Sequence, residues 1–146
     1  MPELEGACSV YLPVPTRIAY EAVLNVSEYP RWWVRPTATS LRKGINGKAA
    51  VGSIIQVRLD GATFDYLVRK IEAGRKIEMT CTGSYRGPAS WTFQPENGGT
   101  RATFRFSLEP GGLLGRLLGK RDGSIAEGHA RVVTTSLERL AAHLAG

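Results

Sequence analysis

The sequence has few of the residues from which metal and covalent-chemistry sites are built. It contains 2 cysteines and 2 histidines among 146 residues. Cys8 and Cys81 lie in separate apolar segments, so we expect buried free thiols rather than a disulfide. His129 and His143 share one segment with no cysteine nearby, a spacing that predicts no zinc site. No metal and no cofactor is therefore expected.

Long hydrophobic runs and a nucleotide-binding loop are also missing. No uninterrupted stretch of about 18 apolar residues occurs, and the N-terminal MPELEGACSV has acidic residues where a secretory signal needs basic ones. Gly111 and Gly112 precede leucines and have no lysine-serine pair after them, so they do not match a phosphate loop. With 42% hydrophobic and 22% charged residues, we expect residues 1–146 to form a single soluble, cytoplasmic domain.

The chain lacks a concentrated basic segment although its net charge is +6. Its basic residues occur in runs of no more than two, as at Arg42-Lys43, Arg69-Lys70 and Lys120-Arg121. Nucleic-acid recognition normally needs clustered charge together with a reading element, and no helix-turn-helix pattern is present. We therefore favour a solvated basic surface and expect no nucleic-acid partner. The sequence names no protein partner.

The most regular pattern is an amphipathic helix at Ser124–Ala145. One face carries the apolar positions, and the opposite face carries Glu127, Arg131, Thr135, Glu138 and Arg139. The inward face comprises Ile125, His129, Val132, Val133, Ser136, Leu137, Leu140 and Leu144. Because His129 and Ser136 are polar residues within this face, the pattern suggests a lined cavity rather than a plain core.

Upstream of this helix the sequence has mostly the period of two that is typical of strands. Strands are predicted at Glu5–Leu12, Thr39–Lys43, Ser53–Asp60, Thr63–Glu72, Lys76–Gly83, Ala89–Gln94 and Arg101–Glu109, with turns that include DGA, EAGR and SYRGP. Short connections favour an antiparallel meander with one wet face. The fold class is therefore α+β.

Two short helices are predicted after the first strand. Thr16 is expected to cap a helix that runs to about Asn25, with Ile18, Ala22 and Val23 on one side. A further helical turn is predicted at Ser27–Trp33. Of the adjacent Trp32 and Trp33, we expect one to be partly exposed or at a cavity rim.

The inward faces of the strands and of the long helix supply the candidate site. The residues predicted to line a ligand pocket are Trp33, Ile55, Val57, Phe64, Tyr66, Met79, Cys81, Trp91, Phe104, His129, Val133 and Ser136. Asp65 alternates outward and would need a bulge to face inward. His129 has two interpretations: a neutral base or donor near a helix N-terminus, or, as we favour, a hydrogen-bonded core histidine.

The segment GGLLGRLLGK at Gly111–Lys120 also has two interpretations. Leucines form an apolar face, while glycines weaken the helix by roughly 1 kcal/mol each. We favour a connector under the sheet. The alternative is a lid over the cavity, formed by Leu113, Leu114 and Leu117.

Several segments resemble a known superfamily. Ala19–Asn25 followed by YPRWW at 29–33, GGTRATF at 98–104 and LEPGGLL at 108–114 resemble segments of the bacterial SRPBCC (START-like) proteins, a superfamily of polyketide cyclase/dehydrase and lipid transport proteins. The resemblance covers nearly the whole chain. It implies a helix-grip fold, in which a seven-stranded antiparallel sheet wraps around a long C-terminal helix, with two short helices after the first strand.

The same resemblance implies the binding or carriage of a hydrophobic small molecule, lipid-like or aromatic polyketide-like, between the sheet and the long helix. No membrane insertion is expected. Two alternatives remain open: a polyketide cyclase/dehydratase-type enzyme, and an interaction protein of the co-chaperone type. Because no catalytic set is visible in the sequence, catalytic residues are unknown and enzymatic activity is undecided.

Overall fold

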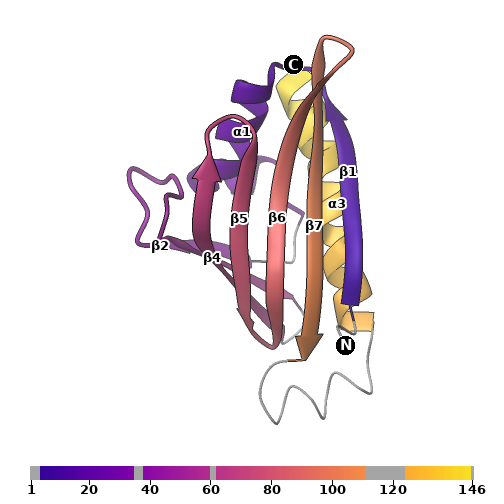
Figure 1. Ribbon diagram of the computed structural model, residues 1–146. Coiled ribbons are helices and arrows are strands. Elements are labelled where there is room, and N and C mark those ends of the chain that lie inside the picture. The colour runs from indigo at the N-terminus through magenta and orange to yellow at the C-terminus, as the bar shows by residue number, and fades with distance from the viewer. Residues whose placement is uncertain (1–3, 35–37, 60–61, 111–123, 146) are drawn as a thin grey trace.

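A computed structural model describes residues 4–34, 38–59, 62–110 and 124–145, and within these ranges the side chains of residues 4, 38, 59, 110, 124–127 and 129 are not described. Figure 1 shows a sheet with helices on one of its faces. The elements are β1 (Leu4–Leu12), α1 (Thr16–Leu24), the 3-10 helix η1 (Val26–Arg31), β2 (Ala38–Arg42), β3 (Ile54–Leu59), β4 (Ala62–Glu72), β5 (Lys76–Gly83), β6 (Tyr85–Glu96), β7 (Gly99–Pro110) and α3 (Ser124–Ala145).

The seven strands form one antiparallel sheet in the order β1-β7-β6-β5-β4-β3-β2. Strands β2 to β7 follow the predicted meander, and β1 joins the sheet beside β7. Alternation sets the two faces, so in β4 Phe64, Tyr66 and Val68 are buried while the residues between them are half-exposed. The fold class and the helix-grip arrangement are thus confirmed.

Helix α3 runs along the sheet and packs most closely on β1 (Figure 1). Val133, Ser136, Leu137 and Leu140 are buried, and exposed positions lie on the opposite face, including Arg131, Thr135, Glu138 and Arg139. The amphipathic pattern of the sequence is confirmed for this part of the helix. The predicted roles of Ile125 and His129 concern side chains outside the described residues.

The first helix differs from its predicted start and predicted face. Pro15 occupies the N-cap position, with no side-chain hydrogen bond to the helix, and Thr16 is the first helical residue. Proline there has the φ of −58° that its ring imposes. The buried side comprises Ala19, Tyr20, Val23 and Leu24, whereas Ile18 is 48% exposed.

Both adjacent tryptophans are buried, so of the two predicted alternatives partial exposure is wrong, whereas a position beside a cavity agrees with Trp33. Trp32 and Trp33 are 2% and 7% exposed. The chain leaves η1 at Trp32, with φ of −137°, so the two side chains are not held at consecutive helical positions. The Tyr29 ring packs against both, 4.7 Å from Trp32 and stacked 5.4 Å from Trp33 between ring centroids.

The predicted turn SYRGP is mostly strand. Strand β6 begins at Tyr85, and the turn from β5 is made by Gly83, with φ of +106°, together with Ser84. Gly87 has φ of +145° within β6, where an added Cβ atom would overlap the carbonyl oxygen of Ser107. Glycine is needed there because the backbones of β6 and β7 approach closely.

Candidate functional site

A small cavity lies between the concave face of the sheet and the helices. Its volume is about 30 Å³, and it is lined by Tyr29, Trp33, Ile55, Val57, Tyr66, Met79, Trp91, Phe104 and Val133. Strands β3 to β7 supply the floor, η1 and the turn after it supply two aromatic rings, and α3 supplies Val133. Such a volume holds about one water molecule, so the core is nearly filled in this conformation.

The cavity wall is largely aromatic. Trp91 and Phe104 have ring centroids 4.9 Å apart, and the Tyr66 ring meets Phe104 edge-on at 5.8 Å. Tyr29 and Trp33 contribute a stacked pair on the helical side. Cross-strand pairing places these rings together, because Trp91 lies opposite Phe104 in the β6–β7 register. The wall therefore presents flat π-surfaces of different orientation.

Tyr66 and Cys81 form a buried polar pair at the floor of this region. They are cross-strand partners, and both side chains are buried. Burial is the main cause that raises the pKa of both groups, to about 12 for Cys81 and well above 10.0 for Tyr66. Both groups are therefore neutral near pH 7. The Cys81 thiol donates to the Tyr85 carbonyl at 3.5 Å.

The structure brings most of the predicted pocket residues to this cavity, but Phe64, Cys81 and Ser136 do not line it. Phe64 stacks on Tyr85 with ring centroids 5.5 Å apart, and Cys81 is the cross-strand partner of Tyr66. The Ser136 hydroxyl accepts a hydrogen bond from the Val34 amide at 3.1 Å, and so ties α3 to the chain after η1.

Tyr29 belongs to the site although the sequence pattern did not predict it. It lines the cavity from the short η1 helix, where no strand alternation pointed to it. The His129 side chain lies outside the described residues. The predicted lid residues Leu113, Leu114 and Leu117 also lie outside the described ranges, so lid and connector remain predictions.

Acidic groups of the strands lie on the other face of the sheet. Asp65 faces outward as predicted, because the register irregularity in β4 occurs further on, between Val68 and Lys70. Its carboxylate accepts a hydrogen bond from the Gln56 side chain at 2.8 Å and lies 3.8 Å from Arg42. Within the described ranges, no group of three or more His, Cys, Asp or Glu could hold a metal ion, and no helix is long and apolar enough to cross a membrane.

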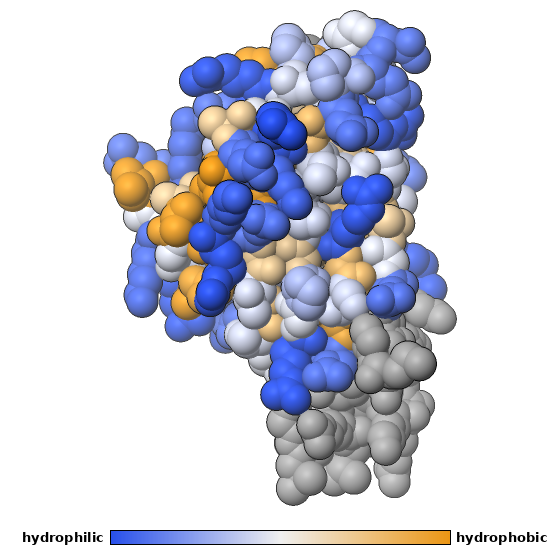
Figure 2. All heavy atoms as spheres, in the orientation of Figure 1, coloured by the Kyte–Doolittle hydropathy of each residue, from blue (hydrophilic) through white to orange (hydrophobic). Residues whose placement is uncertain are grey.

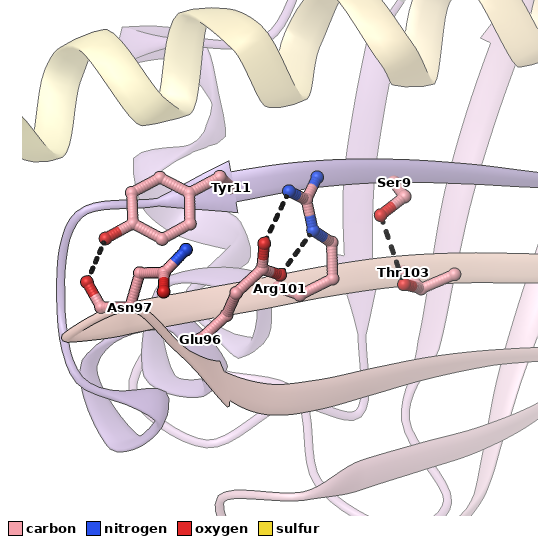
Figure 3. Close-up of polar contacts among 6 residues, drawn as sticks. All are labelled: Ser9, Tyr11, Glu96, Asn97, Arg101 and Thr103. Atoms are coloured by element: carbon pink, nitrogen blue, oxygen red, sulfur yellow. Dashed lines mark hydrogen bonds and ion pairs between the residues drawn. The ribbon is translucent and has the colours of Figure 1, made fainter.

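Polar contacts at the β1 side of the sheet fix the β6–β7 hairpin. The Tyr11 hydroxyl donates to the Asn97 carbonyl at 3.0 Å, and Arg101 donates to both carboxylate oxygens of Glu96 at 2.7 and 3.0 Å (Figure 3). The hydrogen bonds from Arg101 lower the pKa of Glu96. Glu96 is thus an ionised partner in a half-buried ion pair and is unsuited to act as a general acid.

Comparison with known proteins agrees with this architecture. The family model described as "Polyketide cyclase / dehydrase and lipid transport" matches residues 7–145. Similar solved structures include protein CV1439 from Chromobacterium violaceum, with a TM-score of 0.71 and 17% identity over 99% of this chain and 98% of that one. The Aha1 dimer from Colwellia psychrerythraea has a TM-score of 0.68 and 16% identity, covering 97% and 96% of the two chains.

A third similar structure is DynU16, a protein in the dynemicin biosynthetic locus. Its TM-score is 0.68 at 20% identity, and the match covers 98% of this chain but 48% of that one. No curated protein matches the sequence. Identities this low show a common fold alone, whereas the family model spans nearly all residues. The chain belongs to the polyketide cyclase / dehydrase and lipid transport family.

Proposed function

We propose that this protein binds a hydrophobic small molecule between the sheet and α3, and that the ligand is a flat aromatic compound of the polyketide type. The observation that carries the proposal is the convergence of five aromatic side chains on one cavity: Tyr29, Trp33, Tyr66, Trp91 and Phe104. Aromatic rings favour stacked and edge-on contacts with other rings. A saturated acyl chain would gain less from such a wall.

The polar pair beneath the rings supports a way of orienting such a ligand. Tyr66 lines the cavity, and its hydroxyl is neutral near pH 7 because burial raises its pKa. A neutral phenol hydroxyl both donates and accepts hydrogen bonds, so it suits a ligand carbonyl or phenol oxygen. Apolar pockets commonly fix orientation with a small number of such polar groups. We therefore assign Tyr66 as the orienting residue of the proposed site.

Ligand entry requires the cavity to enlarge. Binding pockets for drug-sized molecules are about 300 to 1,000 Å³, whereas the cavity here is about 30 Å³. Met79 is the unbranched side chain of the lining and adapts most readily to a new shape. The proposal is thus that the rings and Met79 rearrange around the ligand, with a measurable change in tryptophan fluorescence.

The nearly filled core favours a second candidate, an interaction protein that binds another protein through its surface and takes up no ligand.

Support for polyketide-type binding comes from the family description and from the locus of DynU16. An enzyme of the cyclase/dehydratase type would use the same cavity, but no carboxylate or histidine is among the described residues that line it.

A binding panel separates these candidates. Native mass spectrometry of the purified full chain, followed by tryptophan-fluorescence titration with a hydroxyflavone and with palmitate, measures uptake directly. We expect saturable binding of the flavone that is tighter than that of palmitate. Tighter palmitate binding would replace the aromatic ligand by a lipid-like one, and no uptake of either compound would favour the interaction protein.

A further inference from the structure

Large hydrophobic side chains are exposed at one end of the molecule. Among the described residues they are Ile18, Ile45 and Val51, at 48%, 64% and 63% exposure. Ile45 and Val51 belong to the β2–β3 loop, residues 43–53, which projects beyond the sheet on the left of Figure 1, where Figure 2 shows hydrophobic surface. Ile18 lies one helical turn before Glu21, whose carboxylate is 3.6 Å from Lys48 of the loop.

The β2–β3 loop is anchored rather than loosely attached. Asn46 and Gly47 make a tight turn with φ of +53° and +77°, and Ile45 and Lys48 form a β-bridge across it. The loop backbone is bonded to the Leu24 carbonyl and to the Ser27 amide. The loop therefore holds its exposed aliphatic side chains in place, away from the core.

The Ser53 side chain joins the two halves of the loop through two hydrogen bonds. The Ser53 hydroxyl donates to the Lys43 carbonyl and accepts from the Ala50 amide, each at 2.9 Å. Ile45 and Val51 are each close in sequence to one end of this link, so both project from one compact unit. Exposed aliphatic residues grouped on one structural unit are more typical of an interaction surface than singly scattered ones are.

The sequence around the loop has an excess of basic residues, although Arg31, Arg42 and Lys48 form ion pairs with Glu28, Asp65 and Glu21. Between Glu28 and Asp60 the sequence contains no acidic residue and six basic ones: Arg31, Arg35, Arg42, Lys43, Lys48 and Arg58. The net charge of the whole chain is also +6, so the remainder is balanced. Lys43 has no carboxylate within ion-pair distance among the described residues. Beside it, a hollow of about 470 Å³ between η1 and β2 is lined in part by Ser27 and Thr39.

We propose that the β2–β3 loop, with the adjacent face of α1, docks on the surface of a membrane that contains anionic lipid. Ile45 and Val51 enter the headgroup region, while Lys43 and its basic neighbours meet the lipid phosphates. The exposed large hydrophobic residues are aliphatic, whereas single-stranded nucleic acid is bound by stacking on aromatic rings. Docking of this kind needs no spanning helix, and it does not depend on the proposed ligand.

Vesicle flotation of the full chain tests this proposal. Phosphatidylcholine vesicles with and without phosphatidylglycerol are compared for the wild type and three variants: Ile45→Ser/Val51→Ser, Lys43→Gln, and Arg105→Gln as the control. Arg105 is an exposed cation on β7, with four strands between it and β2. All the substituted residues are exposed, so circular dichroism and thermal melts should match the wild type.

We expect flotation only with anionic vesicles. The aliphatic double variant should bind at least about ten-fold more weakly, Lys43→Gln about five-fold more weakly, and Arg105→Gln within about two-fold of the wild type. Equal losses in Lys43→Gln and Arg105→Gln, with no effect of the aliphatic changes, would reveal general charge attraction and overturn the proposal. So would absence of flotation, or tighter binding to a DNA oligonucleotide than to vesicles in the same salt.

Discussion

Loss of stability at alkaline pH is expected from the buried thiol of Cys81. The side chain is fully buried in β5, and burial raises its pKa from 9.0 to about 12, with the charge of Asp65 contributing in the same direction. The unfolded chain therefore releases this proton at a lower pH than the folded protein does. The stabilisation is complete below about pH 9 and is lost as the pH rises toward about 12.

The size of the effect follows from the shift. A difference of three pKa units corresponds to about 4 kcal/mol in total, of which about 2 kcal/mol is lost by about pH 10.5. Urea unfolding in the presence of a reductant, at about pH 8 and about pH 10.5, measures this loss for the wild type and for Cys81→Ala. Lysine and tyrosine titrations occur in both proteins, so the difference between them isolates the thiol.

The variant should lose about 2 kcal/mol less stability than the wild type over this pH interval. Its stability at about pH 8 should be lower by about 1 kcal/mol, because the bond to the Tyr85 carbonyl is removed. Equal losses of unfolding free energy in the two proteins at alkaline pH would mean that water reaches Cys81. That result would refute the claim that Tyr66 and Cys81 are shielded from water beside the cavity.

Four other substitutions, one of them a matched control, address separate parts of the structure through urea unfolding. Gly87→Ala should cost about 3 kcal/mol or more, because its Cβ overlaps the backbone of β7, while Gly74→Ala, which meets open space, should cost about 1 kcal/mol; equal costs would argue against the close approach. Ser136→Ala should lower stability by about 1 kcal/mol, and an unchanged value would show that its bond to the chain after η1 contributes nothing. If His129 is the hydrogen-bonded core histidine that the sequence favours, His129→Gln should cost about 1 to 3 kcal/mol; unchanged stability and ligand affinity would rule out a structural or orienting role, and loss of a measured turnover by roughly 10²-fold at unchanged stability would indicate acid/base catalysis.

Periodicity predicted the sheet and the long helix because each element buries one face. A strand with one buried face must alternate, and this alternation alone predicts that Phe64 and Tyr66 point inward and Asp65 outward. The same argument places Val133 and Leu137 on the inner face of α3. Their packing into a common layer depends on the strand order, which the short connections implied.

Local geometry without a repeating period was harder to predict. The burial of Trp32 and Trp33 depends on where η1 ends, and the start of α1 depends on Pro15 rather than on the hydroxyl of Thr16. The sequence did not predict Tyr29 as a cavity residue, because a 3-10 helix of six residues is too short to show an amphipathic pattern. In each case the outcome depends on local backbone geometry, which leaves no repeating pattern in the sequence.

The proposed docking surface at the β2–β3 loop was not predicted from the sequence, for a different reason. Runs of lysine and arginine are short there, so a search for clusters of basic residues finds nothing. The signal is the absence of acidic residues between Glu28 and Asp60, together with aliphatic exposure that the structure reveals. Charge balance along the chain therefore says more here than the length of a basic run.

Titration calorimetry with a hydroxyflavone on the wild type, Tyr66→Phe and Tyr85→Phe tests the central claim, ligand binding in the aromatic cavity, most directly. Tyr66 lines the cavity, whereas Tyr85 is an equally buried tyrosine that does not. We predict saturable binding that Tyr66→Phe weakens by about five- to ten-fold, from the loss of about 1 kcal/mol for one hydrogen bond, and that Tyr85→Phe leaves unchanged. Absence of binding by the wild type, or equal weakening by both substitutions, would contradict the account.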